Sequence, residues 1–291
     1  MDTYNLKPSD ITAHNVAFGI HRIVKNVRQK AALHRSDGQQ TVVLILGCQR
    51  SGTSLTYWIF ERDYNTKIYR ESSALSSQDE VERLRLNPLP EIRETIARQD
   101  VPIVVMKPLV ESQRARELLE ALPGSKVLWL YRHYQDVASS NLKAFGMDNG
   151  INDIRPIAAG DESNWRAQNA TEETRAIIRR HFAEDMNPYD AAALFWYARN
   201  RLFFDQGLDR DPGRAMLCRY EDLAVDPARM MKRVYAFIGT PYPGNEIVQD
   251  VHPQSVGKGK KIAISPEVEQ LCNDLWERLE THYEERLPQA I

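Results

Sequence analysis

One short segment, Gly47 to Ser54, has the residue types and spacing that bind a phosphate or sulfonate group. It combines two glycines with one arginine, Arg50, and with hydroxyl side chains at Ser51, Thr53 and Ser54. Glycines let backbone N–H groups turn inward, and a helix that starts after such a loop adds the positive end of its dipole. A guanidinium can make two parallel hydrogen bonds to the same anion. We therefore predict that this loop binds an anion.

The two glycines of the loop are separated by four residues, as in the phosphate loop of nucleotide hydrolases and kinases. That loop continues with Lys and then Ser or Thr, whereas here Thr53 stands in the lysine position and the cation is Arg50. The loop therefore predicts anion binding by a different scheme. A P-loop kinase or NTPase, and a nucleotide-binding module without catalysis, remain the alternatives.

The elements around the loop follow from hydrophobic patterning. The β-branched run 41–46 predicts a buried strand that leads into the loop, and the apolar spacing after Gly52 predicts a helix. Further strands are predicted at 66–69, 103–106, 127–131 and 215–220, and helices at 80–86, 91–98, 112–122, 135–145, 189–206, 230–239 and 266–283. Strands that alternate with helices predict an α/β fold, a parallel sheet with helices on both faces.

Polar side chains follow the predicted strands where each strand ends. In a parallel sheet the ligand lies beyond these carboxyl ends, so the loop, Glu71, Lys107 and Arg132 are expected to form one active site. Ser140 lies less than two turns into the helix that follows Arg132. We predict that Arg132 and Ser140 form a second anion site.

Residues Gln49 to Ser54 resemble the 5′-phosphosulfate loop of the sulfotransferases that use 3′-phosphoadenylyl sulfate (PAPS). An arginine in the loop is closer to the carbohydrate and tyrosylprotein branches than to the cytosolic small-molecule branch, which has lysine. Three further features match the family. They are Arg132 with Ser140 eight residues later, the run Arg219-Tyr220-Glu221-Asp222-Leu223, and the basic loop 255–261.

The resemblance implies a P-loop-like fold and transfer of a sulfuryl group from PAPS to a hydroxyl or an amine, without a metal. The implied nucleotide-binding residues are Arg50, Ser51, Gly52, Thr53, Ser54, Arg132, Ser140, Tyr220, Gly257 and Lys258. The expected catalytic residues are Glu71, Arg50, Lys107 and Ser255, with Glu71 as general base and the two cations stabilising the transferring group.

Two alternatives concern the base. Glu71 resembles the catalytic glutamate of the tyrosylprotein enzymes, but a salt bridge from Glu71 to Arg70 or Arg62 is the structural alternative. The cytosolic branch places a histidine two residues after its lysine, and Leu109 occupies that position here. His133 is the second candidate.

Composition limits the function further. The 291 residues carry a formal net charge of −2, so nothing global indicates a nucleic-acid partner. The three cysteines, Cys48, Cys218 and Cys272, have no paired spacing, which excludes a disulfide framework and a CxxC zinc site. The sequence has neither a signal-peptide pattern nor an apolar run of transmembrane length, so we expect a cytoplasmic protein. Cys48 lies near a helix start and is a candidate reactive thiol.

The chain divides into a basic N-terminal extension, 1–40, and a sulfotransferase domain, 41–291. No acidic residue occurs from Ile11 to Ser36, and the apolar spacing predicts an amphipathic helix. That helix fits either contact with an anionic membrane or packing on the main domain, and we favour packing. Segment 146–187, interrupted by Gly146, Gly150, Pro156 and Gly160, is predicted as a substrate-binding loop or lid with one helix at 172–181. The acceptor remains open between a carbohydrate, a small hydroxylated molecule and a peptide tyrosine, and the sequence does not specify the oligomeric state.

Overall fold

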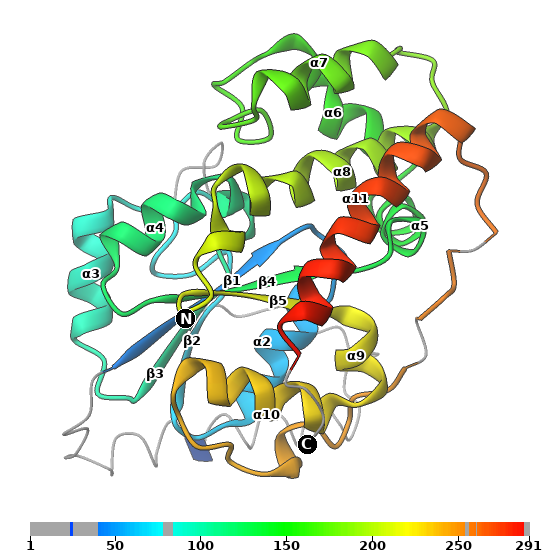
Figure 1. Ribbon diagram of the computed structural model, residues 1–291. Coiled ribbons are helices and arrows are strands. Elements are labelled where there is room, and N and C mark those ends of the chain that lie inside the picture. The colour runs from blue at the N-terminus through cyan, green and yellow to red at the C-terminus, as the bar shows by residue number, and fades with distance from the viewer. Residues whose placement is uncertain (1–23, 26–39, 78–83, 254–255, 260, 288–291) are drawn as a thin grey trace, which may run out of the picture.

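The computed structural model describes residues 24–25, 40–77, 84–253, 256–259 and 261–287 (Figure 1). The strands are β1 (Thr41–Gly47), β2 (Thr66–Tyr69), β3 (Ile103–Met106), β4 (Lys126–Tyr131) and β5 (Ala215–Arg219). The α-helices are α2 (Thr53–Arg62), α3 (Leu89–Ala97), α4 (Ala115–Ala121), α5 (Tyr134–Phe145), α6 (Asn149–Ala159), α7 (Glu172–His181), α8 (Pro188–Asp205), α9 (Tyr220–Val225), α10 (Pro227–Ile238) and α11 (Pro266–Glu285). Short 3-10 helices are η2 (Leu109–Arg114), η3 (Leu208–Arg210) and η4 (Asn245–Ile247).

The five strands form one parallel sheet in the order β2-β3-β1-β4-β5. β1 lies at the centre between β3 and β4, and Gly47 at its end pairs with Leu130. The chain first moves from β1 toward β2 and later crosses to β4 on the other side. The loop after β1 therefore lies at the point where the sheet changes winding direction, which is where ligands bind in open α/β sheets.

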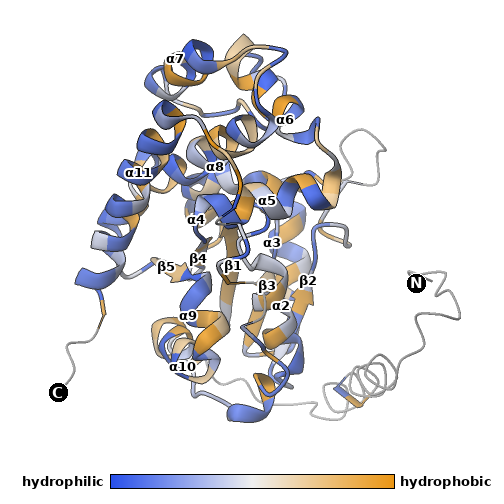
Figure 2. Cartoon of the chain, turned by 90° about the vertical axis from the view of Figure 1, so that its right-hand side faces the viewer, coloured by the Kyte–Doolittle hydropathy of each residue, from blue (hydrophilic) through white to orange (hydrophobic). Residues whose placement is uncertain are grey.

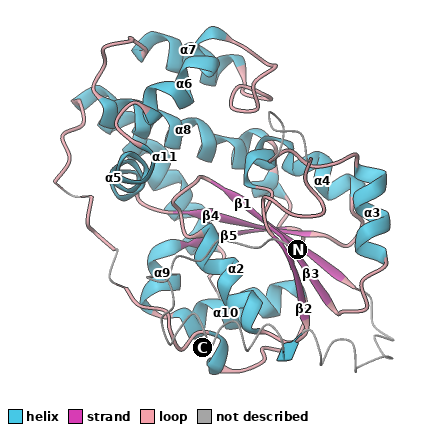
Figure 3. Cartoon of the chain, turned by 180° about the vertical axis from the view of Figure 1, so that it is seen from behind, coloured by secondary structure: helices cyan, strands magenta, loops and turns pink. Residues whose placement is uncertain are grey.

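Alternate side chains of the strands enter two hydrophobic cores, one on each face of the sheet. Val43 and Ile45 pack in the core that includes residues of α2 and α10, whereas Leu44 and Leu46 pack in the core of α3, α4, α8 and α11. Each of these four side chains is fully buried and contributes about 1.5–3 kcal/mol through the hydrophobic effect. Figure 2 shows the strands largely in hydrophobic colours, and Figure 3 shows helices on both sides of the sheet. The predicted fold class is confirmed.

Helices α6 and α7 form an outer layer beyond α8, away from the sheet (Figure 1). Helix α7 has the bounds predicted from the sequence, but the prediction of loop for 149–159 is wrong, because these residues form α6. Gly150 does not break this helix. It lies where α6 packs on α8, and a Cβ there would be 2.7 Å from the backbone nitrogen of Ala192. The glycine signal in the sequence therefore reflected close packing rather than a turn.

Two other predicted helices differ from the structure. Residues 80–83 of the predicted helix 80–86 lie outside the described residues, and Leu86 forms an isolated bridge with Ser76. The buried carboxylate of Glu111 accepts the Leu86 N–H at 2.9 Å, which holds this segment extended. The predicted helix 112–122 begins as the 3-10 helix η2, where the Ser112 hydroxyl lies 2.8 Å from the Leu109 oxygen, and continues as α4.

The predicted N-terminal extension lies almost entirely outside the described residues. Its predicted amphipathic helix, and the contact of that helix with a membrane or with the main domain, therefore stay predictions. Lys25 is described. Its buried ammonium donates to the Glu61 carbonyl and to the Thr66 hydroxyl, each at 2.8 Å. Among the helices that the structure describes, none combines the length and the apolar composition needed to cross a bilayer.

Candidate functional site

The loop between β1 and α2 has a backbone that few residue types adopt. Arg50 has φ 66° and Gly52 has φ 89°, both in the left-handed region. For arginine this conformation costs free energy that the surrounding structure must supply. At Gly52 a Cβ would be 2.5 Å from the ring of Tyr220, so a larger residue is excluded by position as well as by φ. The loop is thus held in one strained shape.

The loop retains capacity for an anion. Helix α2 starts at Thr53, its N-cap makes no side-chain hydrogen bond, and its first turn has no acidic residue. Within the described part of the chain, the buried Ser51 hydroxyl has no hydrogen-bond partner. A buried polar atom left in this way costs about 1–3 kcal/mol, and an anionic oxygen would satisfy it. The residues present therefore fit a phosphate or sulfate group.

A side chain from the outer layer braces the loop. Gln49 donates from Nε2 to Oδ2 of Asp153 on α6 at 3.0 Å. Asp153 is buried and also pairs with Arg166 at 2.6 Å; burial raises the pKa of this carboxyl. No local sequence pattern indicated this contact, because the two partners are 104 residues apart.

Cys48, in the same loop, is not a reactive thiol. Its side chain is fully buried, and burial raises the pKa of the Cys48 thiol to about 12. Thiolate is the nucleophilic form, and almost none is present near neutral pH. The prediction from its place near a helix start was wrong, because desolvation outweighs the helix dipole.

Two predicted anion-binding residues meet at Arg50. The Nε of Arg50 donates to the Ser140 hydroxyl at 3.0 Å, and Nη1 of Arg132 lies 3.5 Å from the backbone oxygen of Arg50. The Arg132 guanidinium is buried and lies 4.3 Å from the centroid of the Tyr220 ring. The structure thus brings together four residues that the sequence placed in the nucleotide site: Arg50, Arg132, Ser140 and Tyr220.

Asp136 joins Arg132 to the basic loop near the C-terminus, and the sequence interpretation missed it. Its Oδ2 accepts from Nη2 of Arg132 at 3.0 Å and from the Gly257 N–H at 2.8 Å, and its Oδ1 accepts from the Gly259 N–H at 2.5 Å. Burial acts to raise the pKa of Asp136, but the hydrogen bonds from Gly259, Gly257 and Arg132 hold it below its usual value. An acid four residues after an arginine was the available signal. Lys258 is exposed.

Ser255, predicted as a catalytic residue, lies outside the described residues. His133, the second candidate base, is described. Its ring stacks on Tyr134 with centroids 4.5 Å apart and meets the edge of Trp276 at 4.9 Å. These contacts place it in an aromatic cluster at the start of α5.

Glu71 and Lys107 form an ion pair at the ends of β2 and β3. The Nζ of Lys107 lies 2.9 Å from Oε2 of Glu71. Lys107 is buried, whereas 27% of the Glu71 side chain is exposed, so the carboxylate can be reached from solvent. Of the alternative partners, Arg62 pairs with Asp250, and Arg70 stacks over the rings of Tyr57 and Trp58.

Comparison with known proteins gives one family and one fold. A model of the sulfotransferase family matches residues 75–244, which are 170 of the 291 residues. The sulfotransferase domain of the olefin synthase from Synechococcus PCC 7002 superposes with a TM-score of 0.52 at 17% identity, covering 84% of this chain and 98% of that domain. A sulfotransferase from Alicyclobacillus acidocaldarius gives 0.47 at 15% identity, covering 87% and 98%. Among curated protein sequences, none matches this chain.

Proposed function

The chain belongs to the sulfotransferase family, and from this membership we propose that it transfers a sulfuryl group from PAPS to a hydroxyl or amine acceptor and releases adenosine 3′,5′-bisphosphate. The family match begins at residue 75 and does not include the anion loop at 47–54. The loop and the family therefore support the proposal independently.

The order of chemical groups along the carboxyl edge of the sheet carries the proposal. Glu71 follows β2, Lys107 follows β3, the anion loop follows β1, Arg132 follows β4 and Tyr220 follows β5. Across the sheet this gives a base, a cation, an anion loop, a second cation and an aromatic ring. This order matches the order of the acceptor, the sulfate, the phosphates and the adenine in a 3′-phosphorylated nucleotide that lies along this edge, and positioning of that kind is what sulfuryl transfer requires.

At the nucleotide end, we assign the loop to the 5′-phosphosulfate. The Ser51 and Thr53 hydroxyls, the N–H groups at the start of α2 and the Arg50 guanidinium supply its hydrogen bonds. Arg132 and Ser140 are assigned to the 3′-phosphate and Tyr220 to the adenine. Gly257 and Lys258 border this end, because Asp136 holds their loop against the start of α5.

At the transfer end, Glu71 removes the proton of the acceptor hydroxyl as its oxygen bonds to sulfur. The bond from sulfur to the bridging oxygen breaks, and its electron pair remains on the departing phosphate. Lys107 and Arg50 stabilise the negative charge that develops on that oxygen. The Lys107 ion pair also holds the Glu71 carboxylate in place before the acceptor binds.

The two alternatives fit the structure less well. A P-loop kinase needs a magnesium-binding acid after an apolar strand, and Glu221 and Asp222 after β5 are the candidates. Oε1 of Glu221 accepts the His133 N–H at 3.1 Å, and Asp222 is paired with Arg219 at 2.8 Å. Asp222 and one oxygen of Glu221 therefore have structural partners, which makes these two acids weaker candidates for binding magnesium. A binding module without catalysis would give no reason for a base beside Lys107.

Labelled PAPS separates the three functions. The protein is incubated with PAPS, a chelator and a panel of phenols, sugars and amines, and both the labelled product and the released 3′,5′-bisphosphate are measured. We expect product with at least one acceptor class and no requirement for magnesium. Phosphoryl transfer from ATP that requires magnesium would favour the kinase. Tight binding of the 3′,5′-bisphosphate with no turnover on any acceptor would favour the binding module.

A further inference from the structure

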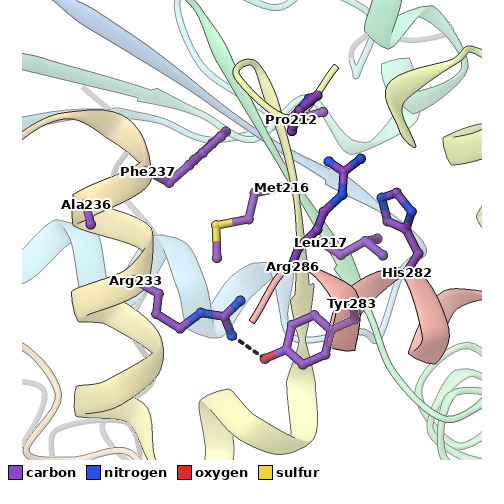
Figure 4. Close-up of a pocket in the computed structure, with 10 residues that line it drawn as sticks. Pro212, Met216, Leu217, Arg233, Ala236, Phe237, His282, Tyr283 and Arg286 are labelled. Atoms are coloured by element: carbon purple, nitrogen blue, oxygen red, sulfur yellow. Dashed lines mark hydrogen bonds between the residues drawn. The ribbon is translucent and has the colours of Figure 1, made fainter. Parts of the chain in front are cut away.

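A cavity lies along β5, between this edge strand, α10 and the end of α11 (Figure 4). We call it the β5 pocket. It is lined by residues 215–217 at the start of β5, whereas Tyr220 of the proposed active site follows the end of that strand. Four residues of strand span roughly 13 Å, so Met216 and Tyr220 belong to different ends of the sheet.

The β5 pocket has the size and the walls of a small-molecule site. Its volume is about 430 Å³, within the range of roughly 300–1,000 Å³ that is usual for ligand pockets. At roughly 30 Å³ for each water-sized group, it accommodates about ten to fourteen non-hydrogen atoms. Met216, Leu217 and Phe237 form apolar walls. β5 is the edge strand of the described sheet, so no further strand covers this side.

Two guanidinium groups border the apolar walls. Arg233 on α10 donates to the hydroxyl of Tyr283 at 2.8 Å (Figure 4). Arg286 after α11 donates to the backbone oxygen of Asp209. Among the residues that the structure describes, neither arginine forms a salt bridge with a carboxylate. Arg233 is partly buried at the wall of the cavity, whereas Arg286 is exposed at its rim. A guanidinium pairs well with the two oxygens of a carboxylate, so both arginines favour an anionic group in the pocket.

We propose that the β5 pocket binds a small amphipathic carboxylate. The apolar body of the ligand packs against Met216, Leu217 and Phe237, and its carboxylate pairs with Arg233 and Arg286. This binding site is independent of the proposed sulfuryl transfer.

Calorimetry with decanoate tests the proposal, because decanoate has twelve non-hydrogen atoms and one charge. Decanol keeps the chain without the charge, and acetate keeps the charge without the chain. We expect one decanoate per chain, with decanol and acetate at least about 10-fold weaker. Equal binding of decanoate and decanol would overturn the role of the arginines, and no binding of decanoate would overturn the site.

Two variants locate the ligand. Arg233→Gln should weaken decanoate binding by about 10- to 100-fold, whereas Arg229→Gln should leave it unchanged. Arg229 is the matched control, since it lies on the same helix, is exposed and pairs with Asp226 at 3.3 Å. Ala236→Trp fills the pocket from its exposed rim without removing a charge and should abolish binding. PAPS turnover should stay at the parent value in Ala236→Trp, which also shows that the variant is folded. Decanoate binding that survives this substitution would place the ligand elsewhere.

Discussion

Replacing Asp136 by asparagine removes one charge and keeps the shape of the side chain. Asp136 accepts three hydrogen bonds, two from the backbone of Gly257 and Gly259 and one from Arg132. No other side chain in the described residues joins the basic loop to Arg132 in this way. We therefore predict that Asp136→Asn releases residues 256–259 from the start of α5.

The size of the effect follows from the geometry. The asparagine oxygen replaces Oδ2 and keeps the bonds to Gly257 and Arg132, whereas its NH2 group faces the Gly259 N–H, which is buried and loses its acceptor. An unsatisfied buried donor costs about 1–3 kcal/mol, and loss of the charge weakens the two remaining bonds by roughly 0.5–1 kcal/mol each. The loop should be destabilised by about 2–5 kcal/mol.

Hydrogen exchange measured by mass spectrometry on the peptide that contains 256–259 is the direct assay. A change of about 2 kcal/mol or more in the opening equilibrium accelerates exchange at least about 30-fold. Asp148→Asn is the matched control, because Asp148 is exposed at the start of α6 and makes no capping hydrogen bond. Exchange in Asp136→Asn that equals the control would refute the assigned role of this carboxylate.

The pH dependence gives a second check on Asp136. Its pKa is lowered in the folded state, so its stabilising effect is complete above the usual value of 3.8 and is lost as the pH falls through the folded pKa. The difference in exchange between parent and variant should therefore be constant at neutral and mildly acidic pH. It should disappear only below about pH 3.8, where the protonated carboxyl resembles the amide.

Four further predictions concern single sites. Glu71→Gln should lower turnover by about 10²–10⁴-fold with nucleotide affinity unchanged. The control Glu94→Gln, on the exposed face of α3, should not alter turnover. Normal turnover of Glu71→Gln with a lower melting temperature would instead indicate a structural role for Glu71. Arg132→Ala should weaken adenosine 3′,5′-bisphosphate by about 10- to 100-fold in calorimetry and AMP far less, and an equal loss for both would remove its assignment. Gly150→Ala should lower the free energy of unfolding in urea by about 1–3 kcal/mol, and an unchanged midpoint would show that α6 and α8 can separate. Cys48 should resist iodoacetamide at pH 8 in the folded protein and react after unfolding, since burial raises its thiol pKa to about 12; rapid labelling of folded protein would contradict its burial.

The inner strands β1, β3 and β4 were predictable because buried parallel strands are continuous apolar runs, whereas the edge strand β2 is short and contains Lys67. Residues 66–69 and 103–106 coincide with β2 and β3, and the run 41–46 ends one residue before the end of β1. Such runs have no competing interpretation when glycine, proline or a charge follows within a few residues. The residues after the strands were therefore predictable as well, since they follow directly from the strand ends.

The outer layer was not predictable by the same means. Gly150 and Pro156 lie inside α6, and both residue types normally indicate a break in a helix. The packing of α6 on α8 explains why a glycine lies inside this helix, because only a glycine at position 150 lets the two backbones approach so closely. The brace between Gln49 and Asp153 has the same origin, because a pair 104 residues apart leaves no local pattern.

The strand register adds a feature of the site that no motif contains. Met106, the last residue of β3, is level with Leu44, three residues before Gly47, whereas Leu130 of β4 is level with Gly47 itself. Measured along the strands, the backbone of Lys107 therefore lies about two residues, or roughly 7 Å, before Gly47, where the anion loop begins. This position, set back from the edge of the sheet, explains why Lys107 is buried although it follows a strand end. A long flexible stem is the appropriate side chain at that depth, because it carries the ammonium to the Glu71 carboxylate, 2.9 Å away, and over the ring of Tyr57 on α2. The position of Lys107 relative to the loop thus depends on strand register as well as on sequence position, and a lysine at the same place in the motif but on a longer strand would extend past the loop.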